Sequence, residues 1–112
     1  MRVKTTEKYN AVVIELKGNV MGGDDTKAFN ELLHKLIEEG KKNVIVDLGD
    51  VKFMNSSGLG MLIGGLTTMK KSEGQLKLAH VTDKIESLLI ITKLITIFEH
   101  FKTIDEAVSS FS

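Results

Sequence analysis

The sequence contains no cysteine, no proline and no tryptophan, and what it lacks limits what the chain can do. Without cysteine it has no disulfides, no thiolate metal ligands and no cysteine nucleophile. Its 15 basic and 15 acidic residues cancel, which disfavours nucleic acid or an anionic membrane as a partner. No apolar run approaches the roughly 20 residues that cross a bilayer, and the polar start does not resemble a signal peptide. We therefore expect a cytoplasmic protein that contacts neither nucleic acid nor membrane.

Clusters of chemically reactive side chains are also missing. The three histidines, His34, His80 and His100, stand far apart and match no metal-ligand spacing. The sequence contains no grouping of histidine, acid and nucleophile, and no Gly-x-x-x-x-Gly-Lys-Ser/Thr phosphate loop. We therefore predict no metal, no cofactor and no enzymatic activity.

The residues that are present predict one α/β domain over residues 1–112, because the chain has no linker, repeat or low-complexity tract. Alternating or continuous apolar runs predict strands at 3–8, 10–17, 43–48, 75–81 and 95–98. Apolar stripes at helical spacing predict helices that begin near Asp25, Leu59, Asp83 and Ile104. This order favours a mixed β-sheet of about four to five strands flanked by about four helices.

The predicted helix ends carry capping residues. Asp24, Asp25 or Thr26 can cap the start of the first helix, and Gly40 suits its end, where a left-handed residue is favoured. The stretch 103–106 reads as a capping box for the last helix.

The stretch FMNSSGLG, residues 53–60, lies between a predicted strand and a predicted helix, a usual place for function in α/β proteins. Asn55, Ser56 and Ser57 can each act as a plain helix cap. One cap suffices, however, and three candidates stand in a row. A phosphorylated serine accounts for the surplus, because it adds about −1.5 to −2 charges at a helix start whose free amides tolerate an anion. Such a group can stop a partner from docking without unfolding the domain.

Glycines in the predicted helix are the second unusual feature. Gly58, Gly60, Gly64 and Gly65 each cost about 1 kcal/mol relative to alanine within a helix. Gly60 and Gly64 lie four residues apart on one face. Two explanations remain open, namely close approach of another element of the same domain or a flat docking surface.

Residues 46–48, 51–54 and 55–60 together resemble the anti-sigma factor antagonists, the small bacterial STAS-domain proteins with the motif Asp-Ser-Ser/Thr-Gly-Leu-Gly after a central strand. The resemblance covers essentially the whole chain and implies the mixed sheet flanked by helices of that family. It implies that the protein binds an anti-sigma factor that is also a serine kinase, and so releases a sigma factor. It further implies that phosphorylation of Ser56, with Ser57 as the alternative, ends binding and that a metal-dependent Ser/Thr phosphatase restores it.

The sequence departs from the family pattern at two places. Asn55 replaces the usual acidic residue before the serine, and the loop 18–25 is longer than in relatives, with Met21 in the place of a typical aspartate. The predicted partner-binding residues are Met21, Asp24, Asp25, Asn55, Ser56, Ser57, Gly58, Leu59, Gly60 and Gly64.

Two other functions compete with the phosphorylation switch. The domain can be a constitutive STAS subunit of a larger regulatory or transport complex, in which the glycine-bearing helix docks permanently and the serines only cap it. A nucleotide-binding protein is a third possibility, suggested by Gly58, Gly60 and the nearby hydroxyls. That function is disfavoured because no lysine is positioned for a phosphate.

Overall fold

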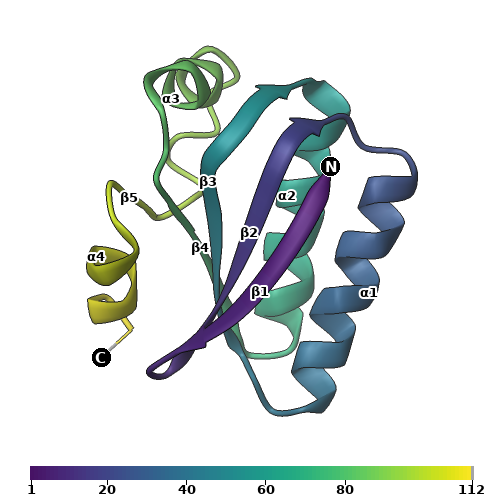
Figure 1. Ribbon diagram of the computed structural model, residues 1–112, viewed down its shortest axis with the longest axis vertical. Coiled ribbons are helices and arrows are strands. Elements are labelled where there is room, and N and C mark those ends of the chain that lie inside the picture. The colour runs from purple at the N-terminus through teal and green to yellow at the C-terminus, as the bar shows by residue number, and fades with distance from the viewer. Residues whose placement is uncertain (112) are drawn as a thin grey trace.

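The computed structural model describes residues 1–111, which form one five-stranded sheet and four helices (Figure 1). The strands lie in the order in which they occur along the chain, β1 Arg2–Lys8, β2 Ala11–Val20, β3 Asn43–Met54, β4 Gln75–Ala79 and β5 His100–Phe101. β1 runs antiparallel to β2, and the other neighbours are parallel. The helices are α1 Asp24–Glu38, α2 Ser56–Lys71, α3 Asp83–Ile91 and α4 Ile104–Ser109. The predicted mixed sheet flanked by helices is confirmed.

The sheet carries helices on both faces. α1 and α2 lie side by side on one face, and α4 lies on the other (Figure 1). Alternate residues of β2 divide accordingly, since Ile14 and Leu16 join the large core under α1 and α2 while Val13 joins a smaller cluster with α4. β3 also contributes to both clusters, which explains why its first half reads as a continuous apolar run.

Two strands are longer than the sequence predicts. β2 continues to Val20 and β3 to Met54, where we expected loops. The parallel pairing of β2 with β3 continues this far through two register shifts, one between Glu15 and Lys17 and one between Gly18 and Asn19. The predicted strand at 95–98 is wrong, since these residues form turns that bury Phe98 in the core and the last strand follows at His100.

The start of α1 also differs from the prediction. Its N-cap is Gly23, and no side chain caps the helix, so the capping roles expected of Asp24, Asp25 and Thr26 are wrong. The Asp25 carboxylate instead lies 3.7 Å from the terminal ammonium of Met1. An acid in the first turn still interacts favourably with the helix dipole, which explains the residue type without a cap.

Two predicted helix ends are confirmed. Gly40 follows α1 with a φ of 76°, and its N–H donates to the carbonyl of Ile37. Thr103 caps α4, because its hydroxyl accepts a hydrogen bond from the N–H of Glu106 at 3.1 Å. Only this half of the predicted capping box is confirmed, since the Glu106 carboxylate accepts from the Thr103 hydroxyl at 3.3 Å. Within residues 1–111, no helix combines the length and the apolar character needed to cross a membrane.

Candidate functional site at the start of α2

The candidate site lies where β3 ends and α2 begins, beside the loop between β2 and α1 (Figure 1). Asn55 is the N-cap of α2, with an extended backbone. Its side-chain oxygen accepts a hydrogen bond from the N–H of Gly58 at 2.8 Å. This contact is the cap that the helix start requires, because it satisfies one of the backbone amides that have no partner inside the helix.

Ser56 and Ser57 are the first two residues of α2, and both are exposed. Within the described residues, neither hydroxyl takes part in a hydrogen bond. The three capping candidates therefore have different roles, since Asn55 caps the helix and the serine hydroxyls remain on the surface.

The loop between β2 and α1 packs tightly on this helix start. The N–H of Asn55 donates to the carbonyl of Val20 at 3.3 Å, and a Cβ at Gly58 would overlap that same carbonyl oxygen. A Cβ at Gly22, whose φ is +81°, would lie 2.7 Å from the Cβ of Ser57. Ser57 is thus packed against the loop, and both glycines are needed for the close approach.

The predicted loop residues have different environments. Met21 is 45% exposed beside the helix start, and Asp24 is exposed without an ion pair among the described residues. Asp25 is partly buried and is engaged by the terminal ammonium. Met21 and Asp24 are therefore available on the surface, whereas Asp25 already has a partner.

The glycines of α2 fall into two groups. Gly58 and Gly65 are buried, and a Cβ at Gly65 would lie 2.7 Å from the ring of Phe29 in α1. Gly60 and Gly64 are exposed, and nothing would lie within 4 Å of a Cβ at either position. Close approach within the domain therefore explains the first pair only. Gly60 and Gly64 line a shallow open groove between α1 and α2.

Leu59 does not belong to the exposed surface. Its side chain is 3% exposed and joins the large core. Together with Gly58, it shapes the helix start from beneath.

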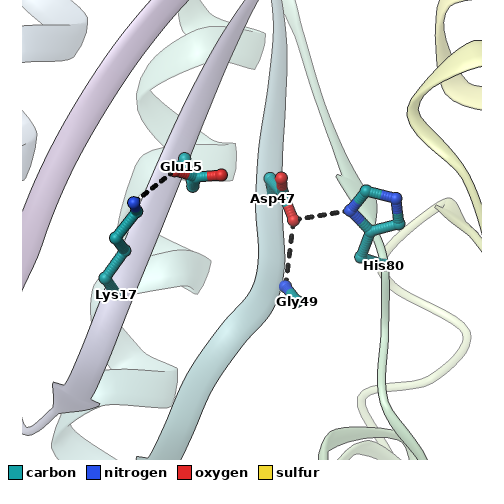
Figure 2. Close-up of polar contacts among 5 residues, drawn as sticks. All are labelled: Glu15, Lys17, Asp47, Gly49 and His80. Atoms are coloured by element: carbon teal, nitrogen blue, oxygen red, sulfur yellow. Dashed lines mark hydrogen bonds and ion pairs between the residues drawn. The ribbon is translucent and has the colours of Figure 1, made fainter.

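The sequence analysis missed a second polar cluster, on the sheet face that α4 covers only in part (Figure 2). The buried carboxylate of Asp47 accepts hydrogen bonds from the N–H of Gly49 and from Nδ1 of His80, both at 2.9 Å. Glu15 and Lys17 pair at 3.1 Å on the neighbouring strand. An aspartate in a strand buried on both faces requires a partner. That requirement was readable in the sequence, but the identity of a partner 33 residues away was not.

No group of three potential ligand residues in the described part of the chain could hold a metal ion. The hydrogen bond that Lys8 donates to Asp105 raises the pKa of the Lys8 ammonium, and the hydrogen bond to Glu7 does the same for the pKa of Lys41.

The sequence pattern of the STAS domain family matches residues 2–107. The chain belongs to this family. An anti-sigma-B factor antagonist of Bacillus subtilis is 32% identical to this STAS domain over 97 residues, which cover 84% of this chain and 86% of the relative. The anti-sigma-B factor antagonist of Staphylococcus aureus is 33% identical over 64 residues, and this match spans only 59% of that relative and 57% of this chain.

Solved structures show the same fold at lower identity. A candidate anti-sigma factor antagonist of Thermotoga maritima superposes with a TM-score of 0.85 at 21% identity, covering 96% of this chain and 92% of the other. The phosphorylated form of the Bacillus cell fate determinant SpoIIAA superposes with a TM-score of 0.74 at 18% identity, covering 99% and 100%. A sulfate transporter family protein of Wolinella succinogenes has a TM-score of 0.79 at 20% identity, covering 94% and 87%.

Proposed function

We propose that this STAS domain is an anti-sigma factor antagonist whose activity is switched by phosphorylation of Ser56. The unmodified protein binds an anti-sigma factor that is also a serine kinase, and this binding frees a sigma factor. The observation that carries the proposal is the Ser56 hydroxyl in the first turn of α2, which is exposed and has no hydrogen-bond partner among residues 1–111, while Asn55 already caps the helix. The serine is therefore available for modification without loss of the cap.

Phosphorylation at this position has a clear physical effect. The Ser56 Oγ attacks the γ-phosphorus of ATP, the bond to the bridging β–γ oxygen breaks, and the serine proton leaves to a base of the kinase as ADP departs. The product carries about −1.5 to −2 charges at an exposed point of the surface. The start of α2 tolerates this anion because it bears partial positive charge. A partner that fits the neutral surface meets added charge and bulk, so docking weakens while the fold persists.

The docking surface is expected to surround Ser56. Met21, Asp24, Gly60 and Gly64 are exposed around or near the start of α2, and the two glycines leave an open groove beside α1. Gly58 and Leu59 support this surface from within.

The asparagine before the serine bears on the chemistry. Asn55 keeps the capping oxygen of the usual acidic residue but carries no charge and cannot accept the serine proton. The kinase must therefore supply the base.

The direct test is incubation of the protein with its cognate kinase and ATP, followed by mass spectrometry of the peptide that contains residues 53–60. We expect one phosphate on Ser56 in the wild type, none in Ser56→Ala, and an unchanged amount in the matched control Ser57→Ala. The Ser56→Ala variant should still bind the kinase. Phosphate on Ser57 alone would move the switch by one residue, and affinity that is unchanged by phosphorylation would refute it.

A metal-dependent Ser/Thr phosphatase completes the proposed cycle. It would hydrolyse the phosphoserine and return the protein to its binding form. Treatment of the phosphorylated protein with such an enzyme should restore binding to the kinase, which a pull-down with the kinase measures.

A constitutive subunit of a transport or regulatory complex is the second candidate function. The structural similarity to a sulfate transporter family protein favours it at the level of fold. Size-exclusion chromatography of the complex, with and without ATP, separates the two functions. The switch predicts dissociation that depends on ATP, whereas a permanent subunit stays bound.

A further inference from the structure

Support for β3 differs between its two edges. On one edge β3 pairs with β2 along nearly its whole length, as far as Val20 and Met54. On the other edge the pairing with β4 ends at Asp47 and Ala79. Within the described part of the chain, residues 48–54 therefore have no strand neighbour on the β4 side, although this stretch leads directly to Ser56.

The first contact on the β4 side of β3 is a hydrogen-bonded group of Asp47, Gly49 and His80 (Figure 2). The carboxylate of Asp47 accepts from Gly49, just beyond the paired region, and from His80, the residue that follows β4. A Cβ at Gly49 would lie 3.1 Å from the Cβ of His80, so the two backbones are already close. Asp47 is only 4% exposed, so its carboxylate needs this partner, whereas the His80 side chain is 41% exposed and reaches the carboxylate from the surface.

The second contact comes from the first turn of α3. The ammonium of Lys84 donates a hydrogen bond to the backbone carbonyl of Lys52 at 3.2 Å. The same ammonium lies 5.5 Å from the centroid of the Phe53 ring. The bonded carbonyl lies within the stretch that β4 leaves unpaired.

We infer that His80 and Lys84 are positioning residues for the phosphoacceptor. Together they take the place of the missing strand and hold the last residues of β3, and thereby Ser56, in one orientation. This inference rests on the proposed function. Phosphoryl transfer depends strongly on alignment, because an acceptor displaced by about 1 Å can lose on the order of 100-fold in rate. Residues that touch neither the kinase nor the phosphate can in this way determine how readily Ser56 reacts.

The test compares variants that break the two contacts with variants that keep them. His80→Ala removes the donor to Asp47, whereas His80→Asn keeps it, since the amide nitrogen of asparagine occupies the position of Nδ1. Asparagine also tolerates the φ of 53° at this residue. Lys84→Met keeps the aliphatic stem and removes the ammonium, and Lys35→Met is the matched control on an exposed lysine of α1.

Two measurements distinguish positioning from a general loss of stability. Steady-state phosphorylation by the cognate kinase should show kcat reduced by about tenfold or more in the His80→Ala, Lys84→Met double variant, as expected for a misplaced acceptor. KM should change less, and both His80→Asn and Lys35→Met should stay near the wild type. Amide hydrogen exchange should become faster over residues 49–54 in the double variant and remain unchanged in α1.

The two readouts also separate this inference from the proposed function. If the kinase does not phosphorylate the wild type, the proposed function fails and hydrogen exchange alone decides the positioning role. Unchanged exchange over residues 49–54 in the double variant would overturn the inference, as would wild-type kcat. Circular dichroism must show that each variant is folded at the assay temperature. If His80→Ala is unfolded there, Lys84→Met alone carries the comparison.

Discussion

At the scale of single residues, the start of α2 separates two tasks that the sequence alone left together. Asn55 satisfies the helix start, and Ser56 remains on the surface. The distinction depends on backbone angles at residue 55, where an extended conformation turns the amide oxygen toward Gly58. A row of three capping residues cannot reveal which of them adopts that conformation, so the sequence could offer the candidate caps but could not assign the cap to Asn55.

Substitutions at the two positions should therefore have unequal effects on stability. Asn55→Ala removes the cap and should lower the free energy of unfolding by about 1 kcal/mol, whereas Ser56→Ala should leave it nearly unchanged. Asn55→Asp keeps an accepting oxygen and serves as the control. Urea titration measures all three. A cost at Ser56 equal to that at Asn55 would show that the serine also caps the helix.

The glycines of α2 give a second prediction at this scale. Gly64→Ala should raise the free energy of unfolding by up to about 1 kcal/mol, because alanine is the better helix former and nothing lies within 4 Å of the new methyl group. Gly58→Ala should be strongly destabilising, since its methyl group would overlap the carbonyl of Val20.

The proposed docking surface gives a further prediction at Gly64. Gly64→Leu should weaken kinase binding without unfolding the protein. Thermal melts test the stability of the three glycine variants, and a titration with the kinase tests the affinity of Gly64→Leu. An unchanged affinity for Gly64→Leu would remove the groove from the docking surface.

At the scale of elements, β1 is an edge strand whose residues are almost all exposed. Its outer edge is free to pair with another chain, a known route to aggregation. The register with β2 places Arg2, Lys4 and Lys8 on the same face of the strand, where they lie beside Lys17, Glu15 and Ala11. In an antiparallel pair of two β1 strands related by a two-fold axis, these cations would face one another or lie close together, which disfavours pairing.

Removal of this positive charge should promote self-association. We expect the Arg2→Thr, Lys4→Val double variant to form dimers or larger species at concentrations where the wild type shows fewer of them. Dynamic light scattering or sedimentation measures the change. An Arg2→Lys, Lys4→Arg variant keeps the charge and should behave as the wild type, so association of that variant as well would contradict the electrostatic explanation.

The attachment of α4 depends on a buried lysine. Lys77 in β4 is 3% exposed, and its ammonium contacts the Ser110 hydroxyl at 2.8 Å, the Glu99 carboxylate at 2.9 Å and the face of the Phe111 ring at 4.4 Å. A charge shielded from water in this way is stabilising only while its partners remain.

Lys77→Ala should therefore loosen α4 selectively. The lost charge-assisted hydrogen bonds predict a cost of about 1.5–3 kcal/mol, with faster amide exchange in α4 than in α1 or α2. Lys77→Met retains the aliphatic contacts with Phe111 and should cost less. Equal acceleration in all helices would show that the lysine supports the whole domain rather than its last helix.

At the scale of the whole molecule, one large core lies between the sheet and α1 and α2, and a smaller cluster lies under α4. The Cα radius of gyration is 12.6 Å, close to the value of about 13 Å expected for a compact chain of this length. Phosphorylation should therefore leave the radius of gyration and the far-ultraviolet circular dichroism spectrum unchanged. Small-angle X-ray scattering of both forms checks this, and expansion of the phosphorylated form would show that it loses binding by unfolding.

The sequence predicted features that depend on neighbours along the chain. The stripe of Phe29, Leu33 and Leu36 that builds α1 repeats at helical spacing, and the order of elements followed from such patterns. Features set by distant contacts were missed. The extension of β3 to Met54 depends on its pairing with β2, and the role of His80 depends on Asp47, 33 residues earlier.

The separation of cap and acceptor at the start of α2 has a consequence for how the domain is controlled. The side chain of Asn55 makes the capping hydrogen bond to the N–H of Gly58. Substitution of Ser56 by alanine, threonine or an acidic residue therefore leaves the cap in place. Under the proposed switch, a single substitution at position 56 would make the domain permanently active or permanently silent without a change of fold.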